Sequence, residues 1–143
     1  MTEPSFIRPR SPREVMCGWV HLPRFVDKLR LHLAGRLHPD YHDNLTRGFD
    51  GRWLATAGVD AAGFTEVVRR SITDGEVAEW VREHVRVDEA TKQAFNAALR
   101  HYPPAEDGAA QDRLRLRKQQ CGLADRDDIR CMFDVIDADE GRL

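Results

Sequence analysis

The stretch LPRFVDKLRLHLAG, residues 22–35, decides the fold of this chain. At a helical step of about 100° per residue, its apolar residues fall on one side and form a core-facing stripe. Cations recur on another side at a spacing of three or four residues. They are His21, Arg24, Lys28 and His32, and together they make up the basic stripe. Leu31 and Gly35 fall within this face, which predicts that another part of the protein packs against it.

The rest of the chain repeats one pattern, in which a capping residue precedes an apolar stripe and a glycine or proline ends the helix. No run alternates apolar and polar residues for long enough to predict a strand. The sequence therefore predicts an all-α, single compact domain of six or seven short helices. The expected helix starts are Ser11–Glu14, Asp60, Thr73 with Glu76, and Asp88; the expected ends are Gly18, Gly58 and Pro103, and the last helix is expected over about residues 125–136.

The expected organisation is simple. Residues 1–10 contain two prolines and no periodicity, so they are predicted to form an extended arm. Residues 11–143 form the helical domain, and residues 103–109 are a possible linker before a C-terminal helical pair.

Composition limits the class of protein. The chain has 143 residues, of which 41% are hydrophobic and 32% are charged, as in one soluble globular domain. A formal net charge of −2 argues against a nucleic-acid partner, because such proteins usually carry a basic surplus. No run of about 18 apolar residues predicts a membrane span, and no secretory signal is evident. Three cysteines without a CxxC pair predict reduced thiols in a cytoplasmic protein.

The sequence contains no phosphate-binding or dinucleotide-binding glycine loop, so no cofactor is expected. Guanidinium and ammonium groups on successive helical turns suit a carboxylate or a phosphate. The preferred interpretation is a binding or interaction module that uses the basic stripe to hold an anionic small molecule or an acidic segment of a partner protein. Internal pairing of the stripe with acidic residues is the structural alternative.

A second functional hypothesis is a small enzyme, with or without a bound metal ion. His38, Asp40 and His42 offer ligand types that zinc, iron or manganese accept, and His32, Asp43 or Asp50 would have to complete the set. A polar loop whose histidines only cap and solvate would give the same pattern. The sequence does not decide whether the protein is an enzyme, and it does not give the oligomeric state.

Acidic residues gather where the last helix should end, at Asp134, Asp137, Asp139 and Glu140. Negative charge there opposes the helix dipole unless fixed cations meet it. One hypothesis therefore brings Asp137 or Asp139 to Arg24 or Lys28, with Ile136 covering Leu31 and Gly35. The alternative is a solvated acidic end.

Several segments, taken together, resemble a known protein family. They are residues 11–14, 22–24, 27–28, 32–35, 48–50, 74–76 and 137–142. The chain resembles a bacterial family known as a domain of unknown function, DUF5069, over about residues 11–142. The resemblance implies a bacterial cytosolic protein and names no activity, cofactor or catalytic residue.

Overall fold

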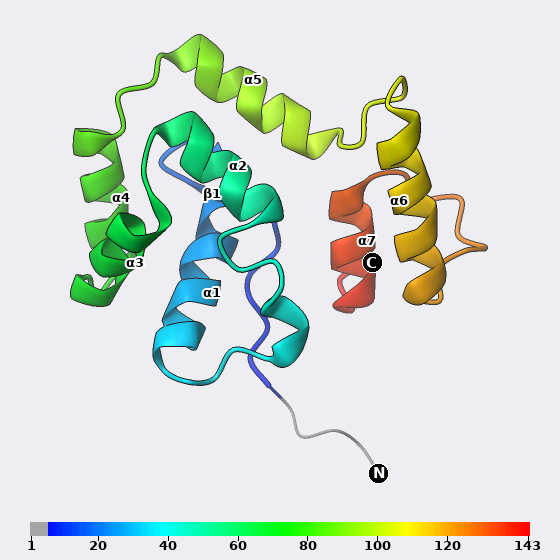
Figure 1. The fold of residues 1–143 in the computed structure, drawn as a ribbon, viewed down its shortest axis with the longest axis horizontal. Helices are drawn as coiled ribbons and strands as arrows, with labels where there is room; N and C mark the ends of the chain where they lie inside the picture. Colours follow the sequence, from blue (N-terminus) through cyan, green and yellow to red (C-terminus); the bar gives the residue numbers. More distant parts are fainter. Residues whose placement is uncertain (1–5) are drawn as a thin grey trace.

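The computed structural model describes residues 6–143, and these residues form mostly helix (Figure 1). Within this range there are seven α-helices, one short 3-10 helix and one two-stranded antiparallel sheet, as the all-α prediction requires. The elements are β1 (Val15–Met16), β2 (Trp19–Val20), α1 (Leu22–Leu33), η1 (Pro39–Tyr41), α2 (Gly48–Ala57), α3 (Ala61–Arg70), α4 (Asp74–His84), α5 (Glu89–Arg100), α6 (Gly108–Gln120) and α7 (Met132–Asp139).

Helix α1 lies at the centre of the larger part of the molecule. Its Pro23 is in the first turn, where a missing N–H costs no helical hydrogen bond. Phe25, Val26 and Leu29 are fully buried and belong to the main core, to which α2, α3, α4 and α5 also contribute. The face that carries the basic stripe is also largely buried, so α1 is covered on both sides.

The predicted helix starts at Asp60, Thr73 and Asp88 are confirmed. Asp60 accepts a hydrogen bond from the Gly63 N–H, and Asp88 accepts one from Thr91. Thr73 and Glu76 form the expected capping box at the start of α4. These local hydrogen bonds satisfy backbone donors that the first helical turn leaves free.

The predicted short helix from Ser11 to Gly18 is wrong, because this segment forms the β1–β2 hairpin. Cys17 and Gly18 have φ angles of 42° and 85°, and together they make a two-residue turn in which Val15 pairs with Val20. Asn96 on α5 accepts a hydrogen bond from the Val20 N–H and donates one to the Gly18 carbonyl. Tertiary contacts with α5 thus favour the hairpin over the local helix signal.

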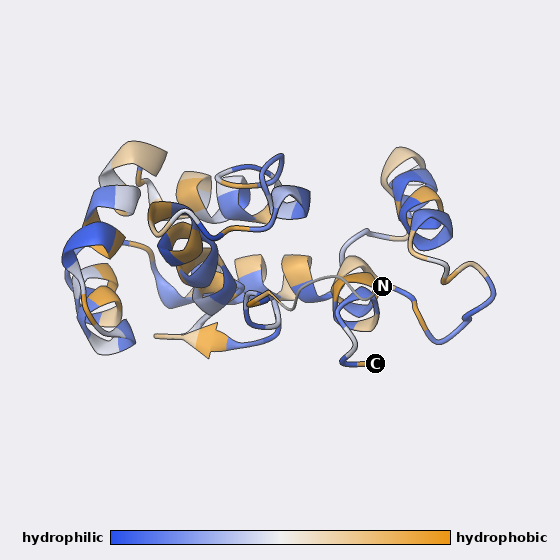
Figure 2. Ribbon diagram, turned by 90° about the horizontal axis from the view of Figure 1, so that it is seen from below, coloured by the Kyte–Doolittle hydropathy of each residue, from blue (hydrophilic) through white to orange (hydrophobic). Residues whose placement is uncertain are grey.

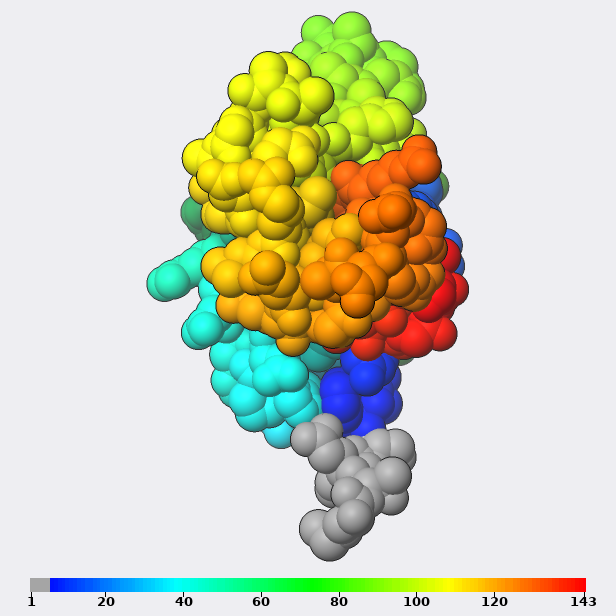
Figure 3. Space-filling view, turned by 90° about the vertical axis from the view of Figure 1, so that its right-hand side faces the viewer, coloured from blue at the N-terminus to red at the C-terminus, as the bar shows by residue number. Residues whose placement is uncertain are grey.

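Helices α6 and α7 form a second, smaller layer beside the body (Figure 1). Their own small core contains Leu114, Leu123, Ile129 and Val135, while Phe133 of α7 joins the main core. Helix α6 is largely hydrophilic (Figure 2), and only Ala110 and Leu114 of it are buried. Figure 3 shows α6 and the segment that follows it covering one end of the molecule, with α7 beside them.

The last helix begins later than the sequence predicts. Residues 121–131 form turns in place of the first part of the expected helix, and α7 starts only at Met132. The Lys118 ammonium donates to the Arg126 carbonyl, which holds these turns against α6. Residues 101–107, which overlap the predicted linker, connect α5 to α6.

Residues 6–10 have no regular structure, and Arg10 binds Asp27 and Asp74. Residues 1–5 of the predicted arm lie outside the described residues. No helix in the described part of the chain is both long and apolar enough to cross a membrane.

Candidate functional site

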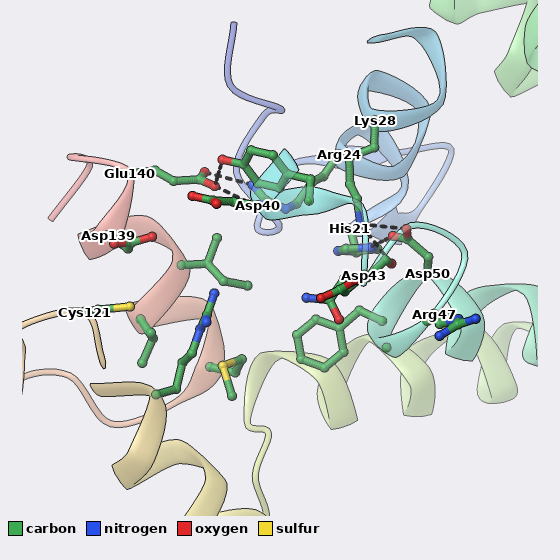
Figure 4. Close-up of a pocket in the computed structure, with 18 of the residues that line it drawn as sticks. His21, Arg24, Lys28, Asp40, Asp43, Arg47, Asp50, Cys121, Asp139 and Glu140 are labelled. Carbon is green, nitrogen blue, oxygen red and sulfur yellow. Dashed lines mark hydrogen bonds and ion pairs between the residues drawn. The ribbon is translucent and has the colours of Figure 1, made fainter. Parts of the chain in front are cut away.

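A cavity of about 870 Å³ lies between the two layers of the molecule. Side chains from α1, η1 and α2 line one wall, and side chains from α6 and α7 line the other (Figure 4). His21, Arg24 and Lys28 of the basic stripe all line it, whereas His32 is exposed and does not. The structure therefore brings three of the four predicted site residues to one place.

Asp50 is the polar centre of the α1–α2 wall. It lies in the first turn of α2 and is fully buried. One carboxylate oxygen is 2.6 Å from His21 Nε2, and the other accepts hydrogen bonds from Lys28 Nζ at 2.7 Å and from the Thr46 N–H at 3.0 Å. Lys28 also donates to the Asn44 carbonyl. Two members of the basic stripe thus bind the same internal carboxylate.

Burial controls the charges of this cluster. It lowers the pKa of His21, an effect that outweighs the opposing influence of Asp50, so the imidazole is neutral at pH 7. Burial alone would raise the pKa of Asp50, but its partners His21 and Lys28 lower it overall. Burial also lowers the pKa of Lys28, despite the nearby Asp50 charge. The geometry fits an ionised Asp50 that accepts the Nε2–H of a neutral His21.

His21 is unusual in two respects. Its φ angle is 69°, which places a non-glycine residue in the left-handed region immediately before α1. Its Nδ1 is buried and has no hydrogen-bond partner within residues 6–143. The backbone is held there because the His21 N–H donates to the Pro12 carbonyl, while the His21 carbonyl accepts from Phe25. Such strain is often found at functional sites.

Arg24 forms the second buried ion pair of the cavity. Its two terminal nitrogens are each 2.8 Å from a carboxylate oxygen of Glu140, directly after α7, in a bidentate pair. The Tyr41 hydroxyl donates to the same carboxylate at 2.6 Å, and Arg142 completes its shell. Burial opposes the charged form of Arg24, but Glu140 raises its pKa overall. The acidic tail therefore meets the basic stripe, as one sequence hypothesis proposed.

The details of that hypothesis need correction. Glu140 contacts Arg24, whereas Asp137 pairs with Arg13 and Arg142. A side chain at Gly35 would meet no atom within 4 Å, so Ile136 does not cover it. Ile136 instead lines the cavity. The register of the last helix caused the error, because α7 ends at Asp139 and not near Ile136.

Besides Arg8, four exposed arginines line the cavity without a carboxylate partner within residues 6–143. They are Arg47, Arg52, Arg113 and Arg117, and they are called the cavity arginines. Arg52 lies over the ring of Tyr102 at 4.6 Å from its centroid, and Arg113 donates to the hydroxyl of that ring at 3.3 Å. The two guanidinium groups come from α2 and α6, so Tyr102 connects the two walls. The exposed Asp40, Asp43 and Asp139 are the cavity's other acidic residues besides Asp50 and Glu140.

The residues of the metal hypothesis do not converge. His38 Nδ1 accepts a hydrogen bond from the Asp40 N–H and so caps η1, while His42 Nε2 is 2.9 Å from the Leu37 carbonyl. Within residues 6–143, no group of three histidine, cysteine or acidic side chains is placed to hold a metal ion. His38 and Asp40 line the cavity, but His42 does not.

Sequence analysis missed most of the cavity wall. The sequence did not single out Arg52, Tyr102 or Arg113 as site residues. One signal was present: Arg113 and Arg117 are four residues apart on a helix, with Leu116 between them. This spacing places the two cations on one face beside an exposed leucine.

The comparisons with known proteins identify the family. The model of a domain of unknown function, DUF5069, matches residues 7–142, so the chain belongs to that family. No curated protein matches the chain. Because the family description names no activity, the function is inferred from the geometry of the cavity.

Proposed function

We propose that this member of the DUF5069 family binds a small organic anion in the cavity between its two layers. The observation that supports this proposal is the set of cavity arginines, which face the cavity from both walls without a carboxylate partner in residues 6–143. Guanidinium groups bind phosphate and carboxylate oxygens in bidentate geometry. An anion that bridges the walls would use this geometry.

Tyr102 indicates where the acidic group of the ligand binds. Arg52 is above its ring and Arg113 is at its hydroxyl, so two like charges are held on one side chain. Their mutual repulsion weakens when an anion lies between them. This position, called the Tyr102 subsite, belongs to both α2 and α6 and is the expected place for a phosphate or carboxylate.

The rest of the cavity favours a ligand with an apolar or ring-shaped part. Phe49, Leu116, Met132, Val135 and Ile136 contribute apolar surface to the walls. The volume of about 870 Å³ falls within the range of small-molecule sites. A small molecule with an acidic group therefore fits better than an acidic segment of a partner protein, which was the other expectation.

The proposal changes the role of the basic stripe. Arg24 and Lys28 are paired with Glu140 and Asp50, so the first contacts of the ligand shift to the cavity arginines. No observation in residues 6–143 favours the metal-dependent enzyme over the binding protein. We also propose a cytoplasmic location, which the three free cysteines support.

The test is calorimetric titration with inorganic phosphate and phenyl phosphate. We expect phenyl phosphate to bind more tightly, because its ring reaches the apolar surface. The double variant Arg52→Gln, Arg113→Gln should weaken binding at least about tenfold, since a hydrogen bond to a charged group contributes about 1.5–3 kcal/mol.

A matched control removes two charges elsewhere. Arg69 and Arg115 are exposed, each pairs with an acid three residues earlier, and neither lines the cavity. Their double replacement by Gln should leave both affinities within about twofold of the wild type, a difference of about 0.4 kcal/mol. The absence of binding in the wild type, or equal losses in the two double variants, would contradict the proposal.

A further inference from the structure

The carboxylate of Glu140 occupies a position of the cavity that is built to hold an anion. Its side chain is only 3% exposed, and its oxygens accept two hydrogen bonds from Arg24 and one from Tyr41. Arg24 and Glu140 lie together at the cavity (Figure 4), and Tyr41 and Tyr102 line the same cavity. Bidentate arginine plus a hydroxyl donor is a common way to bind a carboxylate.

The donors would remain in place without Glu140. The Arg24 guanidinium also donates to the Arg10 carbonyl at 3.1 Å and lies 5.5 Å from the centroid of the Tyr41 ring. Arg10 is itself fixed by Asp27 and Asp74. The cation is therefore positioned by contacts that do not involve the tail, as a preorganised binding group requires.

Glu140, which fills this position, lies in contrast on the C-terminal segment after α7. Glu140 follows the last residue of α7, and the three residues after it are exposed. Helix α7 has separate contacts with the body, because Arg13 binds both Asp134 and Asp137. Removal of Glu140 from Arg24 thus requires the last four residues to move, which breaks the contacts of Arg142 with Asp137 and the Pro9 carbonyl but leaves the Arg13 contacts of α7 in place.

We propose that Arg24 and Tyr41 form a second anion subsite of the cavity, which Glu140 fills until a carboxylate of the bound ligand replaces it. This inference rests on the proposed function and narrows the ligand to an organic molecule with two acidic groups. One group would bind at the Tyr102 subsite, and a carboxylate would bind Arg24 and Tyr41. The displaced Glu140 would enter solvent with the tail.

The alternative is a permanent ion pair that only fastens the tail. Two variants test whether this position can bind a free carboxylate, as the subsite requires. Glu140→Ala empties the subsite and leaves Arg24 buried without its anion, whereas Glu140→Gln keeps the subsite filled by a neutral side chain of the same shape. Both variants should have a lower Tm than the wild type, because each leaves the buried cation uncompensated.

Sodium acetate supplies the missing carboxylate, with sodium chloride at equal ionic strength as the salt control. We expect acetate to raise the Tm of Glu140→Ala saturably, by about 3–6 °C, while it leaves the Glu140→Gln and wild-type proteins unchanged. Folding of Glu140→Ala only in the presence of acetate would also support the subsite. An acetate effect that is absent, equal in all three proteins, or unable to restore folding would overturn it.

The outcome is separable from that of the proposed function. Phosphate and phenyl phosphate test the Tyr102 subsite in the wild type, where Glu140 still fills the second position. Binding there without acetate rescue would leave the proposed function standing and remove the second subsite. Acetate rescue without phosphate binding would show a carboxylate site that does not belong to a two-acid ligand, and so would overturn this inference together with the proposed function.

Discussion

At the scale of single residues, one buried carboxylate determines how the α1–α2 wall responds to acid. Asp50 accepts the Nε2–H of His21 and a hydrogen bond from Lys28, and all three side chains are buried. Burial lowers the pKa of His21 below its ordinary value of 6.5, so the unfolded chain binds a proton more readily than the folded one. The contribution of His21 to the free energy of unfolding is therefore fully present above pH 6.5. It is lost as the pH falls toward the pKa of His21 in the folded protein.

We expect the free energy of unfolding to fall by up to about 1.4 kcal/mol between pH 7.5 and pH 5.5 because of His21. Urea unfolding at the two pH values measures it. His21→Asn should remove this loss, because asparagine tolerates a positive φ and does not titrate. The exposed His32 provides the control, and His32→Asn should keep the full loss. A His21→Asn protein with the wild-type pH dependence would show that another group titrates.

At the scale of elements, local signals predicted the helices where capping and periodicity agree. Asp60, Thr73 with Glu76, and Asp88 start helices through hydrogen bonds within one turn. The hairpin could not be predicted in this way, because the bonds that fix it come from Asn96, more than seventy residues away in sequence. The end of the chain was misplaced for a similar reason, since Lys118 holds the turns before α7.

The hairpin turn offers a direct test of this explanation. Gly18 has a φ of 85°, and a Cβ there would lie 3.3 Å from two atoms of the Lys92 side chain. Gly18→Ala should therefore reduce the free energy of unfolding by about 1–2 kcal/mol, as urea denaturation would show. Gly108, at the start of α6, has open space around it and an ordinary φ. Gly108→Ala should be neutral or slightly stabilising, and equal effects of the two substitutions would count against a requirement for glycine in the turn.

At the scale of the whole molecule, charge pairs between distant segments hold the two layers around the cavity. One of the two sequence hypotheses for the tail brought it to the basic stripe, because unpaired acids at a helix end need cations. The sequence could not predict that Glu140 is the partner of Arg24, since this depends on where α7 ends. It also could not predict that Lys28 pairs with Asp50, because this contact requires α2 to pack against α1. Arg52 and Arg113 both reach Tyr102 only when α2 and α6 lie on opposite walls of the cavity.

These pairings make a selective prediction for the tail. A protein that ends at Asp139 loses the partner of Arg24, but Lys28 keeps Asp50. We expect a free energy of unfolding lower by about 3–5 kcal/mol, because a buried charge is left uncompensated. Phenylglyoxal should then modify Arg24 faster than in the full chain, whereas acylation of Lys28 should stay slow; peptide mass spectrometry measures both rates.

The control for this truncation is the removal of Leu143 alone, which is 55% exposed and should change neither stability nor labelling. The comparison of Arg24 with Lys28 decides between the explanations, because general loosening of the fold would expose both side chains. Faster modification of Lys28 as well as Arg24 would mean that the tail holds the whole α1–α2 wall together. Unchanged stability and labelling would mean that Glu140 does not bind Arg24 in solution. Selective exposure of Arg24 would show that the tail covers one cation of the cavity and that Asp50 holds the other independently.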